Sequence, residues 1–388
     1  MRPLEGVQVL DLSANIAGPA ATLTLARLGA RVIKVERPAG DPSRQWAPFV
    51  DGQSVTFDSL NRGKEGIVLD LNDAGDRSLL ETLAAACDVF VHNYTPDVLA
   101  KLRLREADVK AMNPEIIYCT VGAFGGGPIG ERLPGYDGVA QACTGIMEMT
   151  GHPGTPPTRC APAVVDLGTG QWLVIGVLAA LMARHRGQPV ETIETTLVDT
   201  AIGLVPYQAT EALITGVRPP RYGSGSPLGA PHEVFATADR PIFIGAPSEN
   251  LWRALVSKVL DSPELLDDER FRTGNDRLNN VEPLRVEITR RLCVHPAAHW
   301  TALLTAAEIP TAEVLGLEEA VVDPLAEERR WFEKRPGEQG AVIRMPVLVD
   351  GEIVPTTGAA PTQGEHTAAV RAEFAQKTTE NDRRSRRV

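Results

Sequence analysis

The sequence predicts an α/β protein built on a parallel sheet. In the first 125 residues, short apolar runs alternate with segments of helical periodicity, and strands that are separated by helices pair in parallel. The length of 388 residues predicts two or three domains, at roughly 150 residues each. Gly and Pro together make up 65 of the 388 residues, or about 17%, compared with an average usage of ~12%. This excess indicates long turns and linkers rather than disorder.

The expected strands follow one another at regular intervals along the N-terminal part. They cover residues 7–12, 31–36, 67–71, 88–93 and 116–121, with helices from Pro19, from Asp73 and after residue 93. Ligands of such sheets bind at the carboxyl ends of the strands. The segments expected to face a ligand are therefore 11–19, 36–41, Asn72, 92–96 and 122–130.

The remainder of the chain predicts linkers around a small α+β unit. Four prolines in residues 151–162 indicate an extended linker, and a strongly apolar helix is expected over 168–185. A strand over 190–196 and a helix to about residue 214 precede the Gly- and Pro-rich crossing 216–231. The small unit comprises a hairpin turning near 238–240, helices near 248–260, 281–294 and 296–307, and a strand after Pro310. The tail from Lys377 has no periodicity, so we expect it to be solvated chain.

Charge and motifs exclude several classes of function. The formal net charge of −11 argues against a nucleic-acid binder. Glycine fingerprints of dinucleotide- and ATP-binding folds are absent, and so are the serine-hydrolase elbow and zinc-hydrolase histidine pairs. The five cysteines are scattered without metal or redox spacing, which indicates small buried residues in a reducing compartment.

The chain is expected to be cytoplasmic. Its start reaches Glu5 and Asp11 without the apolar run of a secretion signal. The longest apolar stretch, Trp172–Ala183, is shorter than the ~20 residues that cross a bilayer, and we interpret it as a buried helix. No membrane partner is expected.

Asp166 and two glycine loops are the residues left that could carry chemistry. Asp166 leads into the apolar helix, where an Asp is most often an N-cap that adds about 1 kcal/mol. It could also be a nucleophilic carboxylate, because a helix N-terminus stabilises negative charge. The loops 125–128 and 223–227 are either turns that require positive φ or places where the backbone approaches a ligand closely.

The ordered blocks of the whole chain resemble one family, the class III coenzyme A transferases, a group that includes formyl-CoA transferase, carnitine CoA-transferase and α-methylacyl-CoA racemase. The resemblance rests on the blocks PLEGVQVLDL, LGARVIKVERPAGD, VHNYTPDVLAKL, NPEIIYCTVGAFG, PGYDGVAQACTG, VVDLGTG and GSGSPLGAPHEVFATAD. With the further segments IPTAEV and QGEHT, these blocks run from Pro3 almost to the C-terminus.

The resemblance implies a two-domain fold. A Rossmann-like large domain would comprise residues 1–215, completed by 325–388, and a small α+β domain residues 216–324. It also implies a homodimer of two ring-shaped subunits that are interlocked, an arrangement that pattern alone would not predict because threaded chains are rare.

By the same resemblance, Asp166 matches the family's catalytic aspartate. The carboxylate would attack an acyl-CoA thioester to give a mixed anhydride, and the expelled thiolate would then form an aspartyl-CoA thioester. An acceptor acid would repeat these steps in reverse. The loop Gly223, Ser224 and Gly225 matches the glycine loop that would keep water from these intermediates.

CoA is implied as a substrate, with no permanently bound cofactor and no metal. The residues that match the family's CoA-binding positions are Ile16, Ala17, Arg37, Leu69, Asp70, Leu71, Asn72, Asn93, Tyr94, Thr95, Lys101, Tyr136 and Asp137. Arg37 and Lys101 suit the CoA phosphates in an otherwise acidic protein, although most Arg and Lys are simply exposed.

Departures from the family pattern favour transfer to an acid other than oxalate. Ile16 stands where formyl-CoA transferase has glutamine, and Pro134 where it has lysine. The racemase branch has a His-Asp pair where this chain has Tyr136 and Asp137, and loss of the His removes one acid/base group. An α-methylacyl-CoA racemase, with His92 or His152 as substitute, and a CoA-binding relative without turnover stay as alternatives.

Overall fold

Two compact units make up the chain in the computed structural model, which describes residues 2–334, 341–355 and 358–385. Unit 1 comprises Met1–Ile146, Arg159–Ile214 and Arg329–Val388, and unit 2 comprises Met147–Thr158 and Thr215–Glu328. The domain boundaries inferred from the sequence fall after residues 215 and 324, and most of Met147–Thr158 is expected there to be a linker. In the structure this segment is hydrogen-bonded to the Gly- and Pro-rich crossing 216–231, since Gly223 N donates to Gly151 O at 3.0 Å.

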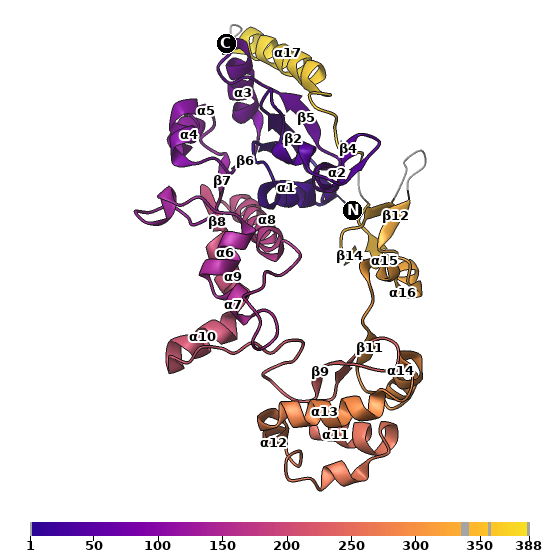
Figure 1. The fold of residues 1–388 in the computed structure, drawn as a ribbon. Helices are drawn as coiled ribbons and strands as arrows, with labels where there is room; N and C mark the ends of the chain where they lie inside the picture. The colour runs from indigo at the N-terminus through magenta and orange to yellow at the C-terminus, as the bar shows by residue number, and fades with distance from the viewer. Residues whose placement is uncertain (1, 335–340, 356–357, 386–388) are drawn as a thin grey trace. The chain divides into compact units, whose positions relative to one another are not determined.

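A parallel sheet of six strands forms the centre of unit 1 (Figure 1). Its strands are β1 Gln8–Asp11, β2 Arg31–Glu36, β5 Glu65–Val68, β6 Val89–His92, β7 Ile117–Gly122 and β8 Thr192–Thr196, in the order β5-β2-β1-β6-β7-β8. Every neighbouring pair is parallel. The α/β prediction is confirmed, with each predicted strand of the first half in place.

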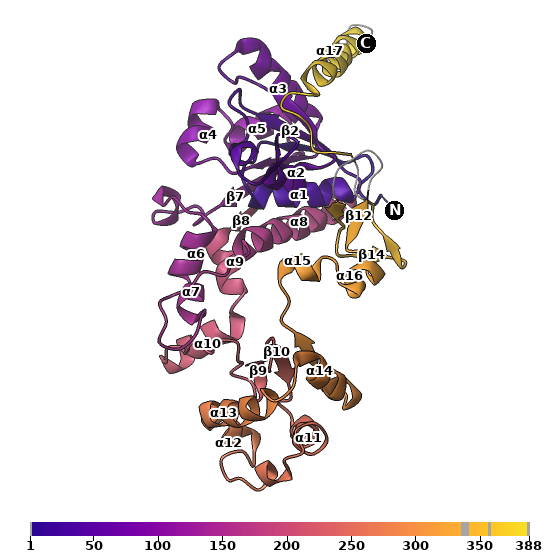
Figure 2. The same cartoon turned by 45° about the vertical axis from the view of Figure 1, so that its right-hand side comes forward.

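Both faces of the sheet are buried because successive side chains point to opposite sides. Val9 and Val32 face one core, which α1 and α8 complete. Leu10 and Ile33 face the other, and residues of the C-terminal helix α17, including Phe374, complete it. Figure 1 and Figure 2 both show α17 beside α3, so the end of the chain returns to the sheet made by its beginning.

Helices cover the two faces of this sheet. The helices of unit 1 are α1 Ala17–Arg27, α2 Val55–Asn61, α3 Ala74–Ala86, α4 Pro96–Leu102, α5 Glu106–Met112, α6 Asp137–Cys143, α8 Val164–His185, α9 Leu197–Gly203, α10 Pro206–Thr215 and α17 Thr367–Ser385, and α7 Ile146–Met149 lies at the boundary with unit 2. Short elements complete it: the 3-10 turns Pro42–Gln45 and Gly130–Arg132, and the strands β3 Phe49–Val50, β4 Gln53–Ser54, β12 Phe332–Lys334, β13 Ala341–Ile343, β14 Leu348–Val349 and β15 Glu352–Ile353.

Two expectations about helices are wrong. The single helix expected after residue 93 is two, because Arg103 adopts a left-handed conformation (φ 51°) that ends α4. The tail from Lys377 is not irregular chain, since α17 continues to Ser385, and residues 386–388 lie outside the described part. Val370 and Phe374 anchor this helix in the core of unit 1.

Helix α8 is longer and less buried than expected. It begins at Val164, four residues before the predicted start, and it runs for 22 residues. Trp172, Ile175 and Met182 are 52%, 53% and 58% exposed. By length and composition alone it could cross a membrane, and 39% of its most apolar window is buried within the structure. Its other face packs on α1, which makes it a core helix with one uncovered apolar face.

Unit 2 is a small α+β unit with its own core. Its elements are β9 His232–Phe235, β10 Ile242–Gly245, β11 Thr311–Glu313, α11 Glu249–Ala254, a π-turn Leu255–Val259, a 3-10 turn Pro263–Leu266, α12 Gly274–Asn279, α13 Val281–Leu292, α14 Ala297–Ala306, α15 Leu317–Ala320 and α16 Pro324–Glu328. The three strands are antiparallel in the order β11-β10-β9. Trp252 and Phe271 pack edge to face in the core.

Two glycines let α8 pack closely on its neighbours near its N-terminus. A Cβ on Gly170 would lie 2.7 Å from the backbone oxygen of Ala17, at the start of α1. A Cβ on Gly168 would lie 3.0 Å from the methyl group of Thr200 on α9. The Gly-Thr-Gly sequence thus fixes how the first turns of α8 sit against α1 and α9.

Gly170→Ala is expected to destabilise unit 1 by about 1–3 kcal/mol, because the new methyl group meets backbone that cannot rotate away. Urea unfolding measures this change. Gly203→Ala, at the end of α9 with no atom within 4 Å, is the matched control and should be neutral or slightly stabilising. Equal stability of the two variants would contradict the close-packing argument.

Candidate active site

A cleft of 410 Å³ lies in unit 1 at the carboxyl ends of β1, β6 and β7. Its walls come from the loops that follow these strands, as parallel-sheet topology predicts. The sequence-predicted residues that line it are Ile16, Ala17, Asn93, Tyr94, Thr95 and Tyr136. The fold therefore brings together three loops that are far apart in the sequence.

A second cavity of 190 Å³ lies beside the first, and Ala14 and Tyr94 line both. It is formed by the loops after β1 and β2, and it includes Arg37. The Arg37 guanidinium donates to Gly40 O at 3.3 Å. Since its side chain is exposed, Arg37 can still meet an anion.

Six other predicted CoA-binding residues line neither cavity: Leu69, Asp70, Leu71, Asn72, Lys101 and Asp137. Leu69 is 1% exposed and packs in the core with Leu71 against it, so only its backbone can reach a ligand. Asn72 donates from Nδ2 to Asp70 Oδ1 at 2.9 Å in the exposed turn after β5. Lys101 is exposed in the last turn of α4.

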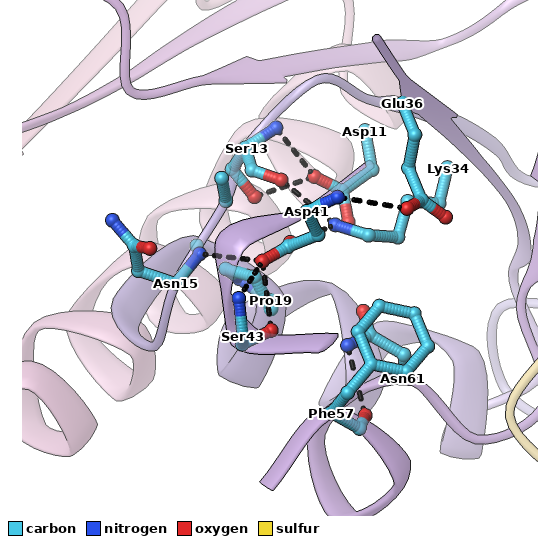
Figure 3. Close-up of polar contacts among 12 residues, drawn as sticks. Asp11, Ser13, Asn15, Pro19, Lys34, Glu36, Asp41, Ser43, Phe57 and Asn61 are labelled. Atoms are coloured by element: carbon cyan, nitrogen blue, oxygen red, sulfur yellow. Dashed lines mark hydrogen bonds and ion pairs between the residues drawn. The ribbon is translucent and has the colours of Figure 1, made fainter. Parts of the chain in front are cut away.

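A buried charge cluster of Asp11, Lys34, Asp41 and Lys64 lies beneath the loop after β1, and Figure 3 shows Asp11, Lys34 and Asp41 with their partners. Lys64 Nζ lies 3.2 Å from Asp11 Oδ2, and Lys34 Nζ lies 2.8 Å from Asp41 Oδ2. All four side chains are at most 1% exposed. Buried charges of this kind are tolerated only when each is paired and hydrogen-bonded.

The buried charge cluster holds the loop that carries Ile16 and Ala17. Asp11 accepts from Ser13 N at 2.9 Å, and Lys34 donates to Ser13 O at 2.9 Å. Burial favours the neutral form of Asp11, but the nearby Lys64 and Lys34 outweigh it, so the pKa of Asp11 is lowered. Burial lowers the pKa of Lys64 to about 8, against the opposing effect of Asp11.

Asn93 joins the loops that follow β1 and β6. Its side-chain amide accepts from Ala14 N at 3.1 Å and donates to Ala14 O at 2.9 Å. The preceding His92 is fully buried, its Nδ1 accepts from Tyr94 N at 3.2 Å, and its Nε2 lies 3.1 Å from the Thr120 hydroxyl. Burial lowers the pKa of His92 to about 4, so this ring is a neutral positioning group for Tyr94.

Asp166 lies in the first turn of α8, not at its N-cap. The N-cap is Ala163, whose side chain makes no capping bond. The carboxylate that receives the first N–H groups of α8 belongs to Asp137 at the start of α6, which accepts from Val165 N at 2.9 Å and Asp166 N at 3.3 Å. The N-cap interpretation of Asp166 is therefore wrong, and its own carboxylate is left available.

The Asp166 carboxylate is half-buried and unpaired. Within residues 2–334, 341–355 and 358–385 no group donates a hydrogen bond to it and no cation pairs with it. Burial and then the charge of Asp137 raise its pKa to about 6. A helix N-terminus would by itself lower that pKa, but here the first N–H groups point to Asp137 instead.

The two glycine loops lie in different units. Gly125 and Gly126 line the cleft of unit 1, where Gly126 N donates to Glu194 Oε1 at 2.9 Å. Gly223, with φ at +62°, belongs to unit 2, and a Cβ there would lie 2.6 Å from the ring of His152. Gly225 N donates to Tyr222 O at 2.8 Å, which closes a tight turn.

Sequence reasoning missed several residues of the cleft. Thr120, Glu131, Glu194 and Leu197 line it, yet none belongs to a motif of chemical meaning. One signal could have identified Leu197 at the start of α9: it directly follows the strand β8, and ligands bind where the strands of such sheets end. In the described part of the chain, no group of three or more His, Cys, Asp or Glu side chains is placed to hold a metal ion.

The sequence of this chain matches the profile of CoA-transferase family III over residues 4–367. It is 35% identical to the acetyl-CoA:oxalate CoA-transferase of Acetobacter aceti over 96% of both chains. It is 37% identical to the succinyl-CoA:glutarate CoA-transferase of Mus musculus, over 82% of this chain and 73% of that protein.

Solved structures also resemble this chain over nearly its whole length. The crystal structure of a CAIB/BAIF family protein from Brucella suis matches 96% of this chain and 99% of its own, with 32% identity and a TM-score of 0.86. The chain belongs to CoA-transferase family III. It is an enzyme of the CoA-transferase class, and such enzymes use CoA thioesters as substrates.

Asp166→Asn is expected to stabilise the protein at neutral pH. The raised pKa means that the native state favours the protonated carboxyl, so stability is lost as the pH rises through about 6. The neutral amide should regain roughly 1–2 kcal/mol at pH 7.5, after allowance for partial exposure.

Urea unfolding at pH 7.5 and 4.5 measures this gain, which should shrink at the lower pH. The exposed Asp267 provides the control, and its change to Asn should leave the pH dependence unaltered. A variant of Asp166 no more stable than the wild type at pH 7.5 would show that its carboxylate is not strained by its surroundings.

Proposed function

We propose that this enzyme transfers CoA from an acyl-CoA to a free carboxylic acid through covalent intermediates on Asp166. The observation that supports this most directly is the half-buried, unpaired carboxylate in the first turn of α8, with its pKa raised to about 6. At neutral pH it is mostly ionised, yet more basic than an ordinary carboxylate, which suits a nucleophile.

The proposed sequence of steps balances without any further reagent. Asp166 Oδ attacks the thioester carbonyl, and the C–S bond breaks to leave a mixed anhydride and CoA thiolate. The thiolate attacks the aspartyl carbonyl, which releases the first acid and leaves an aspartyl-CoA thioester. The acceptor carboxylate then attacks this thioester, and the thiolate expelled takes the acceptor's acyl group, which regenerates Asp166.

The two neighbouring cavities suit the two parts of CoA, its phosphates and its pantetheine arm. Arg37 offers an exposed guanidinium for a phosphate group in the smaller cavity. The larger cleft contains no Lys or Arg among its lining residues in the described part of the chain. Its walls are mostly apolar, amide and hydroxyl groups, with the carboxylates of Glu131 and Glu194, and they suit the neutral pantetheine arm better than the phosphates. We assign CoA to these two cavities.

The acceptor is proposed to be larger or less polar than oxalate. Ile16, an apolar residue at the start of α1, lines the cleft. A coupled assay should test acetyl-CoA and succinyl-CoA as donors against oxalate, glutarate, mesaconate and longer monocarboxylic acids. These include the compounds that appear in the names of the relatives.

A homodimer is proposed from the same family resemblance, with the two subunits interlocked. The uncovered apolar face of α8, with Trp172, Ile175 and Met182, supports a protein interface. A second copy of this chain is the occupant that we propose for it.

Racemase activity is less well supported than transfer. His92 is buried and accepts from a backbone N–H, so it cannot exchange a proton with a substrate. Tyr136 is exposed at the cleft, at the position where the racemase branch has its histidine. Exchange of the α-proton for deuterium in the absence of any acceptor acid would establish this alternative. Tight CoA binding without transfer to any acid would favour a relative that lacks turnover.

Asp166→Ala is expected to abolish transfer, because both proposed covalent intermediates form on the Asp166 carboxylate. In the wild type, incubation with acyl-CoA followed by hydroxylamine should mark Asp166 as a hydroxamate in peptide mass spectra. The control Asp267→Ala should keep both activity and labelling. An active Asp166→Ala enzyme would refute the proposed mechanism.

Gly223→Ala tests the role of the lid loop Gly223–Gly225. The new methyl group would meet the His152 ring and strain a backbone at positive φ, so the loop cannot keep its conformation. If this loop keeps water from the intermediates, hydrolysis should rise relative to transfer by at least about threefold. Gly216→Ala, also at positive φ but in open space, is the matched control. An unchanged ratio in Gly223→Ala would rule out this role.

A further inference from the structure

We propose that Asp137 is a positioning residue for Asp166, which holds the N-terminus of α8 in place and keeps the neighbouring carboxylate free and basic. The inference rests on the proposed role of Asp166 as nucleophile. It differs from the role that the family resemblance implies for Asp137, which is contact with CoA.

The burial of Asp137 separates it from the cleft. Tyr136, the preceding residue, is 72% exposed and lines the cleft, whereas Asp137 is 4% exposed and lines neither cavity. These neighbours begin α6 with their side chains on opposite sides, one toward a ligand and the other toward α8. A carboxylate so deeply buried is not placed to meet CoA.

The hydrogen bonds of Asp137 reach the proposed nucleophile directly. One carboxylate oxygen accepts from the backbone N–H of Val165 and of Asp166, and the other accepts from Gln141 Nε2 at 2.6 Å. Gln141 Oε1 in turn accepts from Cys160 N at 2.9 Å. Residues of α6 thus hold both the start of α8 and the segment that precedes it, through hydrogen bonds to their backbone N–H groups.

This arrangement has a chemical consequence for Asp166. The two N–H groups at the start of a helix usually stabilise an anion nearby, and a carboxylate that receives them is a weak nucleophile. Because Asp137 takes these groups, the Asp166 carboxylate receives none of them. The negative charge of Asp137 also disfavours ionisation of Asp166, which raises its basicity further.

The amide of asparagine cannot reproduce these contacts. One carboxylate oxygen of Asp137 accepts from two backbone N–H groups, and the other accepts from the side-chain amide of Gln141. An NH₂ group in place of either oxygen would therefore face another donor. Gln141 cannot compensate by reversing its own amide, since its oxygen is needed by Cys160 N. Asp137→Asn therefore removes the charge and one set of bonds, and Asp137→Ala removes all of them.

The test is the pH dependence of the first covalent step, measured as the rate at which acyl-CoA forms the hydroxylamine-sensitive adduct on Asp166. In the wild type this rate should fall as the pH falls through about 6, to about a tenth of its plateau at pH 5. In Asp137→Asn the fall should occur at lower pH, so that the fraction retained at pH 5 rises at least about twofold. The plateau rate should drop at the same time.

Two further measurements separate this role from CoA contact and from misfolding. Calorimetric Kd values for CoA should stay within about threefold in Asp137→Asn and Asp137→Ala, while the plateau rate of Asp137→Ala falls by at least about tenfold. The control is Asp239→Asn, because Asp239 likewise accepts from the first N–H of a helix, Ala297 N at 2.7 Å. It should leave rate and pH profile unchanged.

The outcomes also distinguish this inference from the proposed function. Absence of any adduct on Asp166 in the wild type would refute the nucleophile itself. An adduct that forms with an unshifted pH profile in Asp137→Asn, or a large rise in the Kd for CoA without loss of plateau rate, would overturn the positioning role alone. A thermal melt of each variant confirms that it is folded before it is compared.

Discussion

The buried charge cluster is the interaction on which the site depends. Asp11 ends the central strand, and its pairing with Lys64 lets an ionised carboxylate stay inside the protein. The bonds from this cluster to Ser13 fix the path of the loop that begins α1. The start of α1 in turn rests on Gly170, one turn beyond Asp166. Positions at the cleft and at the start of α8 are therefore linked through one rigid series of contacts.

Two carboxylates lie at the N-terminus of α8 in opposite environments. Asp137 is buried and receives the helix donors, while Asp166 is half-exposed and receives none. In the mechanism that we propose, this division keeps Asp166 nucleophilic at a helix N-terminus, where backbone N–H groups would ordinarily stabilise its anion. The cost is a carboxylate that destabilises the fold when it ionises, as active sites often require.

Much of the fold could be predicted because it depends on local pattern. Apolar runs such as Val89–Val91 indicate buried parallel strands, and the cleft lies where such sheets bind ligands, at the carboxyl ends of the strands. The partnership of Asp137 with Asp166 could not be found this way, since it joins side chains 29 residues apart through tertiary packing. Helix α17 was not predicted for a similar reason: its sequence is mostly polar, and its place depends on the packing of Val370 and Phe374 in the core.

The return of α17 to the sheet also constrains how the protein is made. The core that holds Leu10 and Ile33 is completed by Phe374, so a nascent chain exposes that face of the sheet until Phe374 has left the ribosome. Unit 2 is almost entirely contained in Thr215–Glu328, and it can acquire its core earlier. The interlocked dimer that we propose would require this late closure, because the segment that carries α17 must stay free until it has passed around the second copy.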